Sequence, residues 1–224
     1  SEKIGTIDLG SNSARLVIVR LFGGGYFMVE DELKESVRLG QDMDRDGFLK
    51  PQRVAETIKT LKMFKRLCDA SGVTRIIAVA TAAVRRAKNQ RSFLDEIQAT
   101  CGIRVEVLSE EAEATLVYRG VINSMDIPKG IILEIGGGST KIIYYNRRTV
   151  LHYASLSFGA VTLTDLFADD GVSPEEQTRK IEEFFTEQFK KIEWLADVEP
   201  DVQMIGVGGS FRNLDKIHRL VRKY

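Results

Sequence analysis

Apolar and polar residues alternate in two stretches of the chain, and in each stretch the alternation predicts three consecutive strands. The expected strands are 4–9, 14–21 and 26–35 in the first stretch, and 131–135, 141–145 and 150–157 in the second. A tight turn of small and polar residues separates the first two strands of each set. Two meanders of the same pattern indicate that the chain holds two related halves.

After the first meander, apolar residues recur at the spacing of a helix. Pro51 opens this helix, which we expect to run to about residue 70, and Gly72 is placed to end it. A strand over 75–80, a helix near 91–100, a strand over 104–108 and a helix from 110 to about 123 follow. The first half is therefore predicted to have the order βββαβαβα.

The second half is expected to repeat this order without its last strand and helix. A short helix near 160–167 comes first, then a long helix opened by Ser173 and Pro174, a strand over 204–207 and a final helix. The long helix is expected to bury one apolar face, which consists of Ile181, Phe184, Phe185, Phe189, Ile192 and Leu195. We therefore expect a fragment whose second sheet has an unpaired edge near 202–207.

These patterns predict an α/β protein of two domains, with boundaries at 1–125 and 126–224. A chain of 224 residues allows this division, because domains have roughly 100–200 residues. We expect each domain to start with a three-stranded meander and the second domain to be C-terminally incomplete.

Composition excludes several classes of protein. The 32 basic and 32 acidic residues cancel, which argues against a protein that coats nucleic acid. No apolar run approaches the ~18 residues of a membrane span, and we expect no N-terminal signal segment. Cys68 and Cys101 lie far apart in helical patterns, so we expect buried structural thiols and a cytoplasmic location.

The strand–turn–strand segments of the two halves superpose with an offset of 126 residues. Four pairs of equivalent positions carry the superposition: Asp8 and Glu134, Gly10 and Gly136, Ser13 and Ser139, Arg15 and Lys141. Such a duplication favours a functional role for both turns over a plain hairpin.

Both turns have the composition of an anion site. Backbone N–H groups in such turns converge on anionic oxygens, and hydroxyl groups add donors. The residues expected to bind phosphate in this way are Gly10, Ser11, Asn12, Ser13, Gly136, Gly137, Gly138, Ser139 and Thr140. The carboxylates of Asp8 and Glu134 are expected to hold Mg²⁺ directly or through water. The sequence has neither a Walker loop nor the opening glycine motif of a dinucleotide site.

Three further segments offer candidate chemistry. Glu113 lies in the first turn of a predicted helix and is a candidate general base. Arg85 follows the strand over 75–80, and its guanidinium suits a phosphate. Gly208 and Gly209 follow a strand and open a helix, which predicts another anion site, with a tight turn as the alternative.

Taken in order, these motifs resemble those of the exopolyphosphatase / guanosine pentaphosphate phosphohydrolase family, of the actin-like ATPase superfamily. The matching segments are Ile7–Leu16, Ala80–Arg85, Ser109–Ala114 with Gly120 and Val121, Gly136–Thr140 and Gly206–Gly209. The resemblance covers nearly the whole chain. It implies two ribonuclease-H-like domains with a cleft between them, and Mg²⁺-dependent release of terminal phosphate from polyphosphate or from pppGpp.

The resemblance also implies roles for particular residues. The catalytic glutamate of the family falls on Glu113, so water would attack in line while Glu113 accepts its proton. Glu134 stands where the family usually has aspartate, and its expected role is catalytic and metal-binding together with Asp8. Lys141 stands where the family commonly has glutamate. Arg85 would neutralise charge on the phosphate.

The expected partners are polyphosphate or guanosine penta- and tetraphosphate, without nucleic acid or membrane, and a homodimer is left open. Two alternatives remain at this point. One is a kinase of the same fold, which would need an acceptor. The other is a catalytically weak nucleotide- or alarmone-binding regulator, which the residues at positions 134 and 141 would fit.

Overall fold

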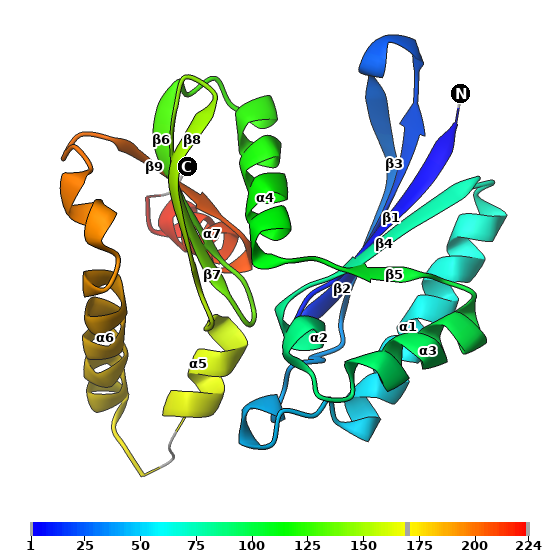
Figure 1. Ribbon diagram of the computed structural model, residues 1–224, viewed down its shortest axis with the longest axis horizontal. Coiled ribbons are helices and arrows are strands. Elements are labelled where there is room, and N and C mark those ends of the chain that lie inside the picture. Colours follow the sequence, from blue (N-terminus) through cyan, green and yellow to red (C-terminus); the bar gives the residue numbers. More distant parts are fainter. Residues whose placement is uncertain (1, 169–170, 223–224) are drawn as a thin grey trace. The chain divides into compact units, whose positions relative to one another are not determined.

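The computed structural model describes residues 2–168 and 171–222. The chain divides into two compact units, Ser1–Ser109 and Glu110–Tyr224 (Figure 1). The boundary predicted from the sequence, at 125–126, lies at the other end of helix α4 (Glu110–Ser124). Helix α4 belongs with the second unit, because Ala114, Tyr118 and Val121 pack into the core of that unit.

Within its described residues, the first unit contains a five-stranded sheet with the order β3-β2-β1-β4-β5. Strand β1 pairs antiparallel with β2 and parallel with β4. The strands are β1 (Lys3–Leu9), β2 (Ser13–Leu21), β3 (Phe27–Ser36), β4 (Arg75–Ala80) and β5 (Val105–Val107). The helices are α1 (Pro51–Ala70), α2 (Ala82–Arg86) and α3 (Gln90–Cys101).

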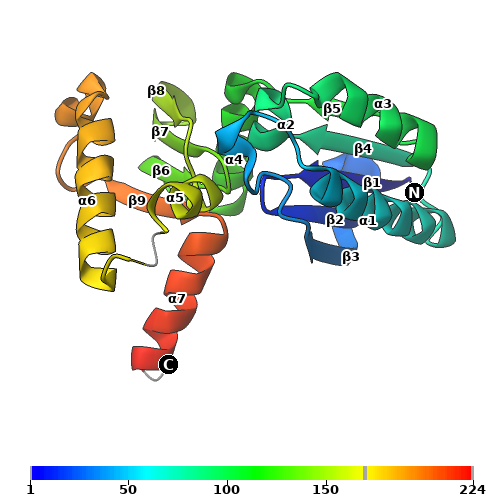
Figure 2. The same cartoon turned by 90° about the horizontal axis from the view of Figure 1, so that it is seen from below.

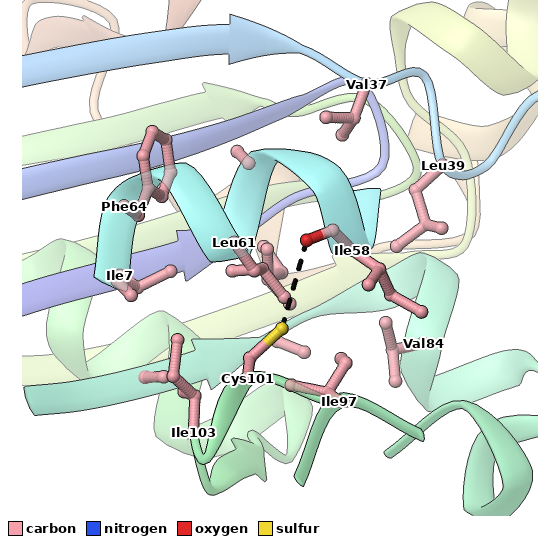
Figure 3. Close-up of a cluster of buried hydrophobic side chains, with 14 of the residues drawn as sticks. Ile7, Val37, Leu39, Ile58, Leu61, Phe64, Val84, Ile97, Cys101 and Ile103 are labelled. Atoms are coloured by element: carbon pink, nitrogen blue, oxygen red, sulfur yellow. Dashed lines mark hydrogen bonds between the residues drawn. The ribbon is translucent and has the colours of Figure 1, made fainter. Parts of the chain in front are cut away.

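The core of the first unit lies between this sheet and two helices that pack side by side, α1 and α3 (Figure 2). Apolar side chains of β1 and β2 meet Leu61 and Phe64 of α1 and Ile97 of α3 (Figure 3). The Cys101 thiol donates to the Ile58 carbonyl oxygen at 3.8 Å. Cys68 and Cys101 are both free and buried, which confirms the prediction of structural thiols, and burial raises the pKa of Cys68.

The described part of the second unit contains a four-stranded sheet with the order β8-β7-β6-β9. Strand β6 pairs antiparallel with β7 and parallel with β9, which forms the sheet edge expected near 202–207. The strands are β6 (Lys129–Ile135), β7 (Thr140–Asn146), β8 (Thr149–Leu156) and β9 (Gln203–Val207). The helices besides α4 are α5 (Ala160–Phe167), α6 (Pro174–Lys190) and α7 (Gly209–Arg222), and α7 extends away from the sheet in Figure 2.

The two sheets confirm the internal repeat. The order β8-β7-β6-β9 reproduces the order β3-β2-β1-β4, with the same antiparallel and parallel pairings. In each unit the turn between the first two strands follows a strand that lies inside the sheet. The repeated glycine and serine positions therefore occupy the same place in both folds.

The sequence patterns missed one helix and placed the end of another too late. Helix α2 has five residues, too few for an apolar period to show. Helix α6 ends at Lys190, before Ile192 and Leu195, which were expected to continue its face. None of the α6 side chains is fully buried. The Phe184 and Phe185 rings of this helix pack edge-on against the Phe158 ring, with ring centroids 5.0 and 5.3 Å apart.

None of the helices that the structure describes is both long and apolar enough to span a bilayer.

Candidate active site

The turn between β6 and β7 is closed on itself and anchored from outside. The Gly136 N–H donates to the Ser139 carbonyl at 2.9 Å. The carbonyl oxygens of Gly136 and Gly137 accept N–H groups from the first turn of α5, from Ala160 and Val161, each at 2.8 Å. In the part of the chain that is described, the N–H groups of Gly137 and Gly138 have no hydrogen-bond partner. Because its carbonyl groups are bonded to α5, the turn leaves these N–H groups available, as the predicted anion site requires.

A glycine at position 159 makes this anchoring possible. A Cβ atom there would lie 2.3 Å from the Gly136 carbonyl oxygen and 2.7 Å from the Gly137 carbonyl carbon. Both contacts are with backbone, which cannot rotate away as a flexible side chain would. Gly159 is therefore part of the site, although the sequence analysis did not include it. The one available signal was its position immediately before a predicted helix.

We expect Gly159→Ala to lower the free energy of unfolding by about 1–3 kcal/mol, because the new methyl group forces α5 and the turn apart. Gly120→Ala is the matched control. It lies inside α4 with open space around the Cβ position, and alanine there should stabilise the helix by about 0.5–1 kcal/mol. Urea unfolding of both variants measures the difference. If Gly159→Ala were as stable as Gly120→Ala, the turn would accommodate a methyl group at position 159.

The first unit has the same arrangement in its turn between β1 and β2. The Gly10 N–H donates to the Ser13 carbonyl at 3.0 Å. The carbonyl groups of Ser11 and Asn12 accept the N–H groups of Gly40 and Arg38, each at 2.8 Å. Among the described residues nothing pairs with the N–H groups of Ser11 and Asn12. Both predicted phosphate turns thus present unpaired amides on an anchored backbone.

A buried ion cluster lies next to the turn of the second unit. The side chain of Lys141, on β7, has 0% exposure. Its Nζ lies 2.6 Å from Glu113 Oε1, 2.8 Å from Ser139 Oγ and 3.2 Å from Glu134 Oε2. An ammonium group has three N–H donors, and these three acceptors use all of them. Lys141 therefore links the turn, through Ser139, to both predicted catalytic carboxylates.

Each member of the cluster is placed by a different element. Glu134 and Lys141 face each other directly in the β6–β7 register. Glu113 comes from the first turn of α4 and is 14% exposed, and Glu134 is 16% exposed. Burial raises the pKa of Glu134 above its usual value, and the Lys141 ammonium opposes part of that rise. Two carboxylates thus share one buried positive charge.

The other residues predicted for the site are Asp8 and Arg85 in the first unit, and Gly208 and Gly209 in the second unit. Asp8 is exposed at the end of β1, and Arg85 of α2 donates to the Leu108 carbonyl at 2.7 Å. Gly208 has a φ of +108°, and a Cβ there would lie 2.9 Å from the Ile135 carbonyl oxygen. Gly208 and Gly209, which begins α7, are thus brought beside the end of β6, next to Glu134.

The geometry around Glu134 does not fit the Mg²⁺ ligand that the sequence predicts there. The carboxylate already accepts the ammonium of Lys141, and a divalent cation on the same carboxylate would be repelled by that charge. Across the described ranges, no three acidic, histidine or cysteine side chains gather as a metal site. Whether the protein uses Mg²⁺ stays a prediction, for which Asp8 is the candidate ligand that remains.

A duplicated α/β unit, with an anchored glycine- or serine-rich turn between its first two strands, defines the actin-like ATPase fold. The fold class predicted from the sequence is confirmed. The chain belongs to the Ppx/GppA phosphatase family, whose family model matches residues 17–223. The family is the one that the sequence motifs resemble.

Solved structures and a sequence relative support this assignment. An exopolyphosphatase from Cytophaga hutchinsonii has a TM-score of 0.89 and 28% identity, over 99% of this chain and 72% of that one. The Aquifex aeolicus member of the Ppx/GppA family has a TM-score of 0.76 and 32% identity, over 100% of this chain and 71% of that one. The guanosine-5'-triphosphate,3'-diphosphate pyrophosphatase of Pseudoalteromonas atlantica is 35% identical over 176 residues, 78% of this chain and 35% of the relative.

The chain therefore spans about a third of the Pseudoalteromonas protein, and about a third of a bifunctional 3-dehydroquinate synthase/phosphatase from Fusobacterium nucleatum.

Proposed function

We propose that this protein is a phosphohydrolase that releases terminal phosphate from inorganic polyphosphate, from pppGpp, or from both. One observation carries the proposal. Lys141 Nζ binds both Ser139 Oγ of the anion-binding turn and Glu113 Oε1, so a carboxylate is held beside a cradle of unpaired amides.

In the proposed reaction, the amides of the turn 136–140 bind oxygens of the terminal phosphoryl group. A water molecule attacks the phosphorus in line, and Glu113 accepts a proton from it. A new P–O bond forms to water, and the bond to the bridging oxygen breaks. The products are phosphate and a polyphosphate shortened by one unit, or ppGpp. Phosphoryl transfer depends mostly on positioning and charge stabilisation, which an anchored turn supplies.

Two relatives support the substrate classes. The Cytophaga protein is described as an exopolyphosphatase, and the Pseudoalteromonas relative is named for a guanosine polyphosphate substrate. Both substrates end in a phosphoanhydride-linked phosphate, the group that the turn would bind. Within the first unit, Asp8 is the proposed ligand for Mg²⁺ and Arg85 is the proposed phosphate-binding side chain. A cytoplasmic location is part of the same proposal.

The direct test is phosphate release from long-chain polyphosphate and from pppGpp, each with Mg²⁺ and with EDTA. We expect release from at least one substrate, and the faster of the two identifies the preferred class. Absence of release from both substrates, in a protein that is folded by circular dichroism, would contradict the proposal.

The Lys141–Glu113 ion pair also favours a second candidate, a regulator that binds the alarmone without hydrolysing it. In that case the ammonium neutralises the carboxylate permanently and leaves only the anion-binding turn. Calorimetric binding of pppGpp together with no phosphate release would support the regulator over the hydrolase.

A further inference from the structure

We propose that the Lys141 ammonium is a tethered cation that takes the place of a divalent ion between Glu113 and Glu134. In this proposal Glu134 holds a lysine instead of a metal, and Lys141 is a positioning residue for both carboxylates. The inference concerns the ion chemistry of the second unit and does not depend on whether the protein hydrolyses phosphate.

The first argument is the completeness of the lysine's contacts. Its three acceptors come from three segments: the start of α4, the end of β6 and the turn. A fully buried ammonium persists only where its charge is paired and its N–H groups are bonded. Lys141 meets both conditions without any added ligand, so the cluster is already a closed cation site.

The second argument is the complete burial of the lysine side chain, which is 0% exposed. Every residue of β7 from Thr140 to Tyr145 is buried, so both faces of this strand are covered. The face that holds Lys141 is covered by α4, which supplies Glu113. A lysine at an exposed strand position could swing out and leave its carboxylate to a metal, whereas the side chain of Lys141 is enclosed by the strand's neighbours and α4.

The third argument comes from the equivalent pair in the first unit. Asp8 and Arg15 face each other across β1 and β2, as Glu134 and Lys141 do across β6 and β7. Arg15 is 40% exposed and forms an ion pair with Glu32 on β3, and Asp8 is exposed. At equivalent positions of the repeat, the carboxylate of the first unit is thus exposed, whereas that of the second unit is paired with a fully buried lysine.

The proposal predicts what happens when the positive charge is removed. Glu113 and Glu134 would then be two buried carboxylates around a space without a cation, and oxygen-rich sites of that kind attract divalent ions. Lys141→Gln should therefore bind Mn²⁺ about tenfold or more tightly than the wild type, because a repelling charge is lost. Adding Glu134→Gln to Lys141→Gln should abolish that gain.

The test is a Mn²⁺ titration of the full chain, followed by electron paramagnetic resonance. Wild type, Glu134→Gln, Lys141→Gln, the double variant and Lys129→Gln are compared, each checked for folding by circular dichroism. Lys129 is the matched control, since it is a partly exposed lysine of the same unit that pairs with the exposed Glu199. We expect Mn²⁺ binding to be unchanged in Glu134→Gln and Lys129→Gln and to increase in Lys141→Gln.

Weaker Mn²⁺ binding by Glu134→Gln than by wild type would overturn the proposal, because Glu134 would then hold a metal beside Lys141. This comparison decides the matter even if Lys141→Gln fails to fold. A folded Lys141→Gln that gains no Mn²⁺ binding would overturn it as well. No turnover is measured, so failure here is distinct from failure to release phosphate.

Discussion

Replacement of Glu113 by glutamine is expected to lower kcat for phosphate release by about 10²–10⁴-fold, the usual contribution of a general base. Glutamine keeps the size of the side chain, and its amide oxygen can still accept the Lys141 N–H. Substrate binding by the turn 136–140 should persist, so KM should change little. Initial rates on the preferred substrate separate the two parameters.

Glu111→Gln is the matched control, because Glu111 is an exposed carboxylate in the same first turn of α4. Its kcat should equal that of the wild type. If Glu113→Gln kept most of the wild-type kcat, the proton would be accepted elsewhere. If both variants lost activity equally, the effect would come from the helix terminus and not from Glu113.

Lys141→Met is expected to lower the free energy of unfolding by about 3–5 kcal/mol, the cost of removing one partner from a buried ion pair. Methionine fills a similar volume but leaves Glu113 and Glu134 without their shared cation. The double variant Lys141→Met/Glu134→Gln should recover part of the loss, because one of the two negative charges is removed. Urea denaturation of both variants measures the effect.

Lys129→Met provides the comparison for an exposed lysine, whose ion pair with Glu199 is open to solvent. It should unfold close to the wild-type midpoint. A Lys141→Met variant as stable as Lys129→Met would mean that the cluster does not depend on the ammonium.

Most of the secondary structure could be predicted because its signals are local. Alternation of apolar and polar residues marks the strands themselves. Pro51 and Gly72 lie at the two ends of α1, and Ser173 and Pro174 lie at the start of α6, so each signal is within a few residues of the helix end that it specifies. The internal repeat added long-range information, because it predicted that the turns at Gly10 and Gly136 would be equivalent. Helix α2 is too short for a period, and α6 ends at Lys190 although the apolar spacing continues to Ile192 and Leu195.

The residues of the candidate site could be proposed from the sequence, but the contacts between them could not. Glu113, Glu134 and Ser139 were identified from their places after strands and in the first turn of a helix. The contact between Glu113 and Lys141 joins residues 28 positions apart on different elements, and no local pattern specifies it. Likewise, the place of Gly159 against the turn depends on how α5 docks, which only the folded chain shows.

Hydrolysis in water enriched in heavy oxygen tests the central claim most directly. Polyphosphate or pppGpp, whichever reacts faster, is converted in labelled water, and the released phosphate is analysed by mass spectrometry. Attack by water on the terminal phosphorus predicts phosphate that carries one heavy oxygen, with far slower release by Glu113→Gln. Unlabelled phosphate, or release only when an acceptor is added, would contradict the account and favour transfer to another group.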